Sequence, residues 1–142
     1  MNAIDQKLDS SAAHAALEAV ARAFAGGPHR VDLACDTGLD LPAGDVAALG
    51  EIAAVAVELT IARAFPDGRA GHVWIRLTRD GGRIKLSVSN DGMGAPEDAP
   101  EGFGRIEALA ARLGGFARVG ARLFGGSEIA VVYRAGQDLS RA

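Results

Sequence analysis

The chain has 142 residues, of which 49% are hydrophobic and 23% charged, a composition that suits one globular domain with a substantial core. Its net charge of −3 gives no electrostatic footprint for nucleic acid, and no apolar run approaches the ~20 residues of a membrane span. The N-terminus has neither the basic nor the apolar region of a signal peptide, and the single Cys35 excludes an intrachain disulfide and a cysteine-rich zinc site. We therefore expect a cytoplasmic protein without nucleic-acid or membrane partners.

The first half of the chain predicts two helices separated by a strand. Residues 1–9 are polar, and we expect them to be flexible. Apolar residues recur at helical spacing over 12–25, alternate as in a strand over 30–35, and return to helical spacing over 45–65. The last of these helices is the longest, and it is apolar on most sides, which indicates a central, buried position.

The second half predicts two hairpins with a helix between them. The expected elements are strands over 71–79 and 83–89, a helix over 103–113, strands over 116–119 and 127–133, and a flexible tail over 137–142. This order predicts an α+β fold, a two-layer α/β sandwich in which helices cover one face of a mixed, mostly antiparallel sheet. We expect a single domain over residues 10–136, with the long helix and a glycine-rich loop lining a cleft on the helical side.

The glycine-rich loop joins the strand over 83–89 to the helix over 103–113. The residues of interest in and directly after it are one acid at its start and four glycines: Asp91, Gly92, Gly94, Gly102 and Gly104. Glycines let a backbone approach a ligand closely, and free N–H groups at a helix start attract negative charge. An Asp-Gly pair after a strand is also typical of an ordinary turn. If the loop binds a ligand, the carboxylate of Asp91 would repel phosphate and is better suited to an amino group.

Two acids, Glu51 and Glu58, interrupt the long apolar helix. They are seven residues apart and therefore share one stripe of the helix. Acids in this setting usually mark the solvent edge of a helix, and less often they face a cleft. Both interpretations stay open at this point.

Four other side chains could carry chemistry. His14, near the start of the first helix, could be a phospho-acceptor, but an exposed polar residue fits better because no acidic or basic partner follows it. Cys35 is interpreted as a small buried hydrophobe. His72 and Trp74 share one face of their strand, where we expect surface or interface residues rather than ligands.

Several spaced blocks of the sequence resemble the ATP-binding domain of sensor histidine kinases, the GHKL or Bergerat fold, and most nearly its HWE type. The blocks are Leu49-Gly50, Ala64-Phe65-Pro66-Asp67-Gly68, Ser89-Asn90-Asp91-Gly92-Met93-Gly94, Gly102-Phe103-Gly104-Arg105-Ile106-Glu107-Ala108-Leu109-Ala110, Leu113-Gly114-Gly115 and Gly126-Ser127-Glu128-Ile129. They stand in the family's order and cover roughly residues 29–134. The resemblance implies a histidine-kinase ATPase-like fold and ATP or ADP as the ligand.

The resemblance also implies a role for each matching residue. The implied nucleotide-binding residues are Asp91, Gly92, Gly94, Gly102, Gly104 and Ser127. Asp91 would accept a hydrogen bond from the adenine amino group, the first two glycines would shape that pocket, and Ser127 would lie near the base. The second pair of glycines would let the backbone approach the phosphates.

The long helix departs from the family pattern. The family carries a Glu and, four residues later, an Asn whose oxygen binds the magnesium ion that bridges the phosphates. Counted back without a gap from the Ala-Phe-Pro signature, those positions are Val55 and Leu59, which offer no side-chain oxygen. Glu58 could replace the family Glu only if the helix shifts by one residue, although Glu51 and Glu58 could approach a metal from their shared stripe. We therefore expect a degenerate magnesium site.

The segment that corresponds to the family's lid over the nucleotide is short and acidic. Residues 95–101 contain three acids, two prolines and no basic residue. Negative charge facing a triphosphate is unfavourable, although Arg105 could offset it.

The resemblance leaves two functions open. One is a stand-alone histidine-kinase-type ATP-binding signalling module, a pseudokinase that keeps part of the adenine site. The other is a non-catalytic adaptor, or a phosphotransfer or regulatory protein, that works in two-component or anti-sigma signalling without binding ATP. The expected partner is a response regulator, a histidine kinase or a sigma or anti-sigma component, and a homodimer is an alternative. Only one short helix precedes the domain, so we expect a lone module rather than a complete sensor kinase.

Overall fold

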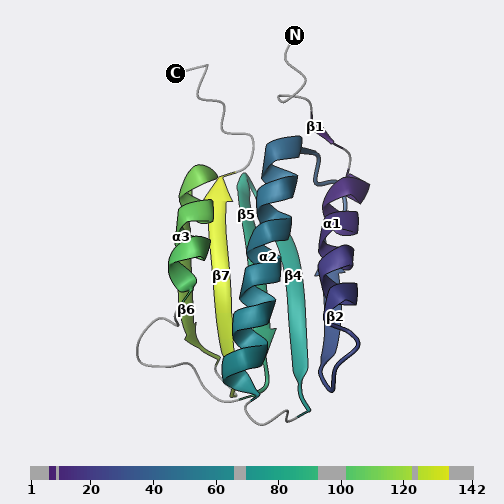
Figure 1. Cartoon of the computed structure of the whole chain (residues 1–142). Coiled ribbons are helices and arrows are strands. Elements are labelled where there is room, and N and C mark those ends of the chain that lie inside the picture. Colours follow the sequence, from purple (N-terminus) through teal and green to yellow (C-terminus); the bar gives the residue numbers. More distant parts are fainter. Residues whose placement is uncertain (1–6, 9, 66–69, 93–101, 123–124, 135–142) are drawn as a thin grey trace.

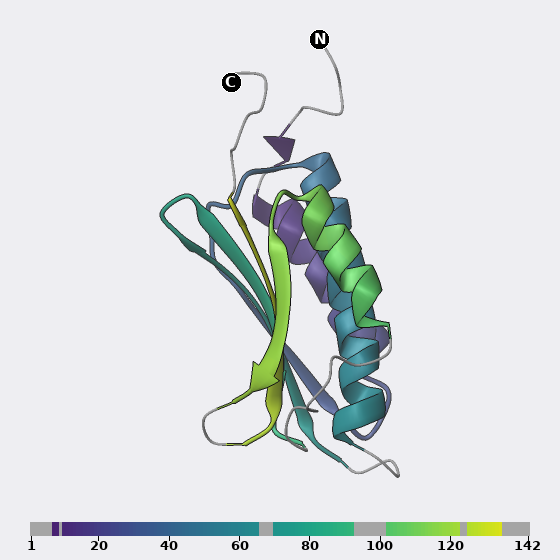
Figure 2. The ribbon, with the colours of Figure 1, turned by 90° about the vertical axis from the view of Figure 1, so that its left-hand side faces the viewer.

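Three helices cover one face of a five-stranded sheet in the computed structural model, which describes residues 7–8, 10–65, 70–92, 102–122 and 125–134 (Figure 1). The elements are β1 (Lys7–Leu8), α1 (Ser10–Ala23), β2 (Arg30–Cys35), β3 (Leu41–Pro42), α2 (Ala43–Ala64), β4 (His72–Asp80), β5 (Arg83–Asn90), α3 (Phe103–Arg112), β6 (Phe116–Ala121) and β7 (Ser127–Arg134). Seen edge-on, the helices form one layer and the sheet the other (Figure 2). The α+β sandwich expected from the sequence is confirmed.

The sheet is mixed and mostly antiparallel, as expected. Its strand order is β2-β4-β5-β7-β6. Only the pair β2 and β4 is parallel among the strands of this described sheet, and the other three pairs are antiparallel. The β4–β5 hairpin turns at Gly81, whose φ of 63° is a left-handed conformation that glycine adopts without strain.

Alternation along the strands separates the two faces of the sheet. On β4, Val73, Ile75 and Leu77 are all 0% exposed and point to the helical layer. The residues that alternate with them, including His72 and Trp74, therefore lie on the face that no helix covers. The hydrophobic core thus lies between the sheet and the helices.

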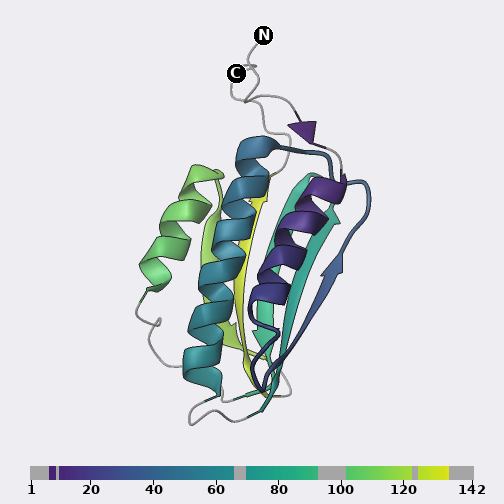
Figure 3. The ribbon, with the colours of Figure 1, turned by 45° about the vertical axis from the view of Figure 1, so that its right-hand side comes forward.

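Helix α2 lies in the middle of the helical layer, with α1 on one flank and α3 on the other (Figure 3). Its buried residues are Val46, Ala48, Leu49, Ile52, Ala53, Ala56, Val57, Thr60 and Ala64. The close approach of α1 follows from small side chains, because a Cβ on Gly50 would lie 3.7 Å from the Cβ of Ala16. The central, buried position expected for the long helix is therefore confirmed, and its other flank faces α3.

Two short strands were not expected. Lys7–Leu8, in the N-terminal segment expected to be flexible, form β1. Leu41–Pro42, expected in a loop, form its antiparallel partner β3. Two-residue strands are too short to show alternation, so the sequence gives no signal for them. The other boundaries shift by about one or two residues, which is ordinary for element ends. No helix in the described part of the chain is both long and apolar enough to cross a membrane.

Candidate functional site

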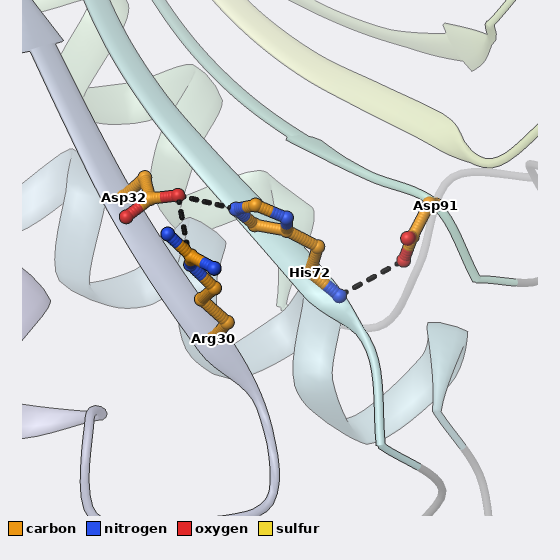
Figure 4. Close-up of polar contacts among 4 residues, drawn as sticks. All are labelled: Arg30, Asp32, His72 and Asp91. Carbon is orange, nitrogen blue, oxygen red and sulfur yellow. Dashed lines mark hydrogen bonds and ion pairs between the residues drawn. The ribbon is translucent and has the colours of Figure 1, made fainter.

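Asp91 follows the last residue of β5 and lies beside the start of β4. Its Oδ1 accepts a hydrogen bond of 2.9 Å from the backbone N–H of His72, and its own N–H donates to the carbonyl of His72 at 3.3 Å (Figure 4). The residue is exposed, and its Oδ2 has no hydrogen bond to the described residues. The carboxylate is therefore held in place by one oxygen while the other can accept a bond from a ligand.

Asn90 anchors the loop next to Asp91. It is only 1% exposed, its Nδ2 donates to Ser127 Oγ at 2.8 Å, and its Oδ1 accepts from the N–H of Gly92 at 2.8 Å. The guanidinium of Arg122 donates to the Asn90 carbonyl at 2.9 Å. Asn90 and Arg122 were missed as site residues. An Asn at the end of a strand and directly before Asp-Gly is typical of a turn in which the side chain bonds the N–H two residues on, and this signal could have identified Asn90.

Gly92 lies against the end of α2. A Cβ on Gly92 would lie 2.3 Å from the carbonyl oxygen of Ala64 and 2.7 Å from the ring of Phe65. Gly126 similarly leaves room for Asn90, because a Cβ there would lie 1.8 Å from the Asn90 carbonyl oxygen. Packing within the protein accounts for both glycines without any ligand.

The flank of α2 that faces α3 is apolar where α3 begins. Val55 and Leu59 are partly buried and pack against the core. A Cβ on Gly102, which precedes α3 with a φ of 95°, would lie 3.2 Å from Leu59 Cδ2. The position that the resemblance assigns to the metal-binding Asn is therefore occupied by a leucine that packs near the start of α3.

Of the described glycines that the resemblance assigns to the loop, Gly92, Gly102 and Gly104, only Gly104 has open surroundings. It lies in the first turn of α3, is exposed, and a Cβ on it would have no atom within 4 Å. The first turn of α3 has no acidic residue, and no side chain caps the helix. The N–H of Arg105 already donates to the Gly102 carbonyl at 3.1 Å, which leaves the N–H groups of Phe103 and Gly104 as the candidates to face an anion. Packing does not require a glycine at position 104.

The two acids of α2 differ in their contacts. Glu51 forms an ion pair with Arg105 of α3, so the arginine that could offset an acidic lid is already paired. Glu58 is exposed and forms no ion pair with the described residues. No group of three or more His, Cys, Asp or Glu side chains that could hold a metal occurs in the described part of the chain.

A polar and aromatic cluster lies on the helix-free face of the sheet, close to Asp91 (Figure 4). The Nε2 of His72 contacts Asp32 Oδ2 at 2.5 Å, and Arg30 Nε lies 3.3 Å from the same oxygen. The ring of His72 stacks on Trp74 at 4.0 Å between centroids, and the guanidinium of Arg122 lies 4.9 Å from the Trp74 centroid. Arg122 therefore links this cluster to the loop that carries Asp91.

The other two candidate side chains do not join the site. His14 is exposed on α1. Cys35 packs partly buried against the core, and burial, with the Asp36 carboxylate as a second cause, raises the pKa of its thiol. A raised pKa disfavours the reactive thiolate at neutral pH.

No protein-family model and no curated protein matches the sequence. Solved structures do match its fold. The Erythrobacter litoralis EL346 blue-light activated histidine kinase superimposes with a TM-score of 0.76 at 22% identity, over 92% of this chain and 43% of that chain. The catalytic domain of histidine kinase ThkA superimposes with a TM-score of 0.72 at 15% identity, over 91% of this chain and 94% of that chain. The mycobacterial sensor histidine kinase MprB superimposes with a TM-score of 0.65 at 22% identity, over 93% of this chain and 98% of that chain. The chain has the fold of a histidine kinase catalytic domain.

These structures are at most 22% identical to the chain, so the likeness establishes the architecture alone. The chain spans 43% of the EL346 kinase chain and 66% of the chain that carries its histidine kinase domain. Activity, substrate and partner are therefore matters for proposal.

Within this histidine-kinase fold, three predicted residues meet through Asn90 at one end of the sheet: Asp91, Gly92 and Ser127. Gly102 and Gly104 lie at the start of α3, and Glu51 and Glu58 lie on α2. Gly94 and the acidic segment over 95–101 lie outside the described residues.

Proposed function

We propose that the chain is a histidine-kinase-type signalling module that binds an adenine nucleotide but does not perform magnesium-dependent phosphoryl transfer. The fixed, exposed carboxylate of Asp91 supports nucleotide binding, and the apolar flank of α2 supports the absence of magnesium-dependent chemistry.

Asp91 supports the adenine side of the proposal. An amino group donates hydrogen bonds, and an ionised carboxylate accepts them, so the Oδ2 of Asp91 suits the adenine amino group. The bond from the His72 N–H fixes the carboxylate before a ligand arrives, which lowers the entropic cost of binding. Ser127 would lie near the base, and Gly104 with the N–H groups of α3 would lie near the phosphates.

The apolar flank of α2 is the observation that carries the non-catalytic part. Magnesium requires hard oxygen ligands in a near-octahedral arrangement. Val55 and Leu59 have no side-chain oxygen, Leu59 packs near Gly102, and Glu51 is paired with Arg105. Glu58 alone would be a weak ligand. These residues do not fit a magnesium ion, so we propose that nucleotide binding is independent of magnesium.

Two matched Asp→Asn variants test the adenine site in calorimetric titrations with ADP. Asp36→Asn is the control, because Asp36 is also exposed and also accepts a backbone hydrogen bond at an end of β4, from Arg79 at 2.8 Å. We expect Asp91→Asn to lose at least about tenfold in affinity, which corresponds to ~1.4 kcal/mol, and Asp36→Asn to bind like the wild type. Equal affinities in all three proteins would exclude Asp91 from the site.

A second function is favoured by the tight packing of the loop. Gly92 and Ser127 already have protein partners in α2 and Asn90, which leaves fewer groups for a ligand. The module would then act without nucleotide as an adaptor or a phosphotransfer or regulatory protein in two-component or anti-sigma signalling. Its partner would be a response regulator, a histidine kinase or a sigma or anti-sigma component. Failure of the folded protein to bind nucleotide at millimolar concentration selects this function.

A further inference from the structure

One face of the sheet carries no helix (Figure 2), and the strands place an excess of cations on this face. Alternation along the five described strands places six basic residues on it, Arg30, Arg76, Arg83, Lys85, Arg118 and Arg134, against three acids, Asp32, Asp80 and Glu128. The whole chain has 15 Lys and Arg against 18 Asp and Glu. Charge is therefore segregated between the two layers, with the excess of cations on the bare sheet face.

Ion pairs neutralise part of this face and leave its centre positive. Arg30 pairs with Asp32 at 3.3 Å, and Lys85 Nζ lies 3.6 Å from Glu128. Arg76 and Arg118 have no ion pair with the described residues. Their charges are consequently available to a partner.

Arg76 and Arg118 belong to one row that crosses the sheet. Arg76 is paired with Ser87, Ser87 with Ala130, and Ala130 with Arg118. Ser87 is 5% exposed and Ala130 is 0% exposed, although no helix covers this face. Long side chains of neighbouring residues must therefore cover them, and the arginine stems at the two ends of the row are placed to do so. Both arginines are exposed, so the row presents two guanidinium groups on this face.

The next row adds an apolar contact. Phe116, on the edge strand β6, is 57% exposed, and its pairing partner Val132 lies on the same face. Phe116 lies two residues from Arg118 on the same strand, and an exposed aromatic ring near an arginine is typical of the energetic centre of a protein interface. Because β6 is the edge of the sheet, a partner can reach this ring without displacing any described element.

We propose that this cationic sheet face, defined by Arg76, Arg118 and Phe116, docks an acidic protein segment that also carries an apolar side chain. Charge complementarity favours the acidic partner, and like charge opposes the same face of a second copy. A nucleic acid fits less well, because Trp74 is already stacked on His72 and lies under Arg122, so its ring is not a free platform for a base. The proposal does not depend on nucleotide binding.

The fluorescence of Trp74, the sole tryptophan of the chain, reports on this face because Trp74 lies in the row next to Arg76. The probe is a short synthetic peptide in which glutamate alternates with leucine, and the control peptide has lysine in place of glutamate. We expect the glutamate peptide alone to bind, with an affinity that falls as salt screens the charges. The double variant Arg76→Glu with Arg118→Glu should lose at least about tenfold in affinity.

The matched control carries the same charge change on the helical layer, as Arg22→Glu with Arg112→Glu on α1 and α3. It should bind the peptide like the wild type. The double variant Arg76→Gln with Arg118→Gln keeps much of the apolar stems and removes both charges. It should also lose affinity for the glutamate peptide, and it serves as the test if the glutamate variant unfolds. Circular dichroism verifies folding.

Three results overturn the proposal. One is no binding of the glutamate peptide to the folded wild type, and another is an equal loss in the sheet-face and helical-layer variants. The third is tighter binding of a single-stranded oligonucleotide or an anionic lipid vesicle than of the peptide.

Discussion

Gly92 and Gly104 are both glycines to which the sequence resemblance assigns nucleotide binding, yet their surroundings differ. A Cβ on Gly92 would meet the carbonyl oxygen of Ala64 at 2.3 Å, whereas a Cβ on Gly104 would meet nothing within 4 Å. Gly92→Ala should therefore lower the free energy of unfolding by ~1–3 kcal/mol, as overpacking does. Gly104→Ala should raise it by ~0.5–1 kcal/mol, because alanine loses less backbone entropy in a helix.

Urea denaturation of both variants measures these changes, with ADP affinity measured alongside. Gly104→Ala should bind ADP more weakly than the wild type while being more stable, because its Cβ lies where the backbone would approach the phosphates. A Gly92→Ala variant as stable as the wild type would contradict the close packing of this loop on α2.

The chemical type of single residues was readable from the sequence, but their contacts were not. Asp91 and the glycines were identified because a strand, a glycine-rich loop and a helix follow one another along the chain. Arg122 was missed because its roles depend on neighbours far away in the sequence: it reaches the Asn90 carbonyl and Trp74 only after β6, β7, β5 and β4 have paired. Whether Gly92 serves packing or a ligand likewise depends on where α2 ends.

Helix α2 is the element on which the proposed absence of a magnesium site can be tested. Restoring the family pattern with Val55→Glu and Leu59→Asn supplies two oxygen-bearing side chains on the flank that faces α3. We expect the double variant to bind ATP about tenfold more tightly with magnesium than without it, a dependence absent from the wild type. Its stability should fall by ~1–3 kcal/mol, since Leu59 loses its packing near Gly102.

The control is Ile61→Asn, which removes a partly buried apolar side chain from α2 at a position about 200° around the helix from Leu59. It should show the loss of stability without the magnesium dependence. If the restored variant binds no better with magnesium, the loss of the metal site extends beyond Val55 and Leu59.

Helices and hairpins were predictable because each has a strong periodic signal over many residues. The long apolar run of α2 and the alternation in β4 and β5 identified those elements to within about two residues. The pairing of β1 with β3 was not predictable, because two residues carry no period. The parallel placement of β2 beside β4 is also set by tertiary packing, and no local pattern in Arg30–Cys35 indicates it.

The two layers of the whole molecule separate two proposed roles. The residues that we propose to bind nucleotide lie at the end of the sheet near α2 and α3, and the cationic sheet face lies on the side that no helix covers. Arg122 contacts both the Asn90 carbonyl beside the nucleotide loop and the Trp74 ring on the open face. Arg122 therefore connects the loop to the open face, but it is not one of the residues that define the cationic sheet face.

The decisive measurement is a calorimetric titration of the wild-type protein with ATP in the presence and absence of magnesium. A module that holds the adenine through Asp91 and has no metal ligands at Val55 and Leu59 should bind ATP with affinities that agree to within about twofold in the two conditions. Magnesium that tightens binding about tenfold or more would contradict this and would mean that other side chains rebuild the metal site. No binding at millimolar ATP would contradict the adenine site itself.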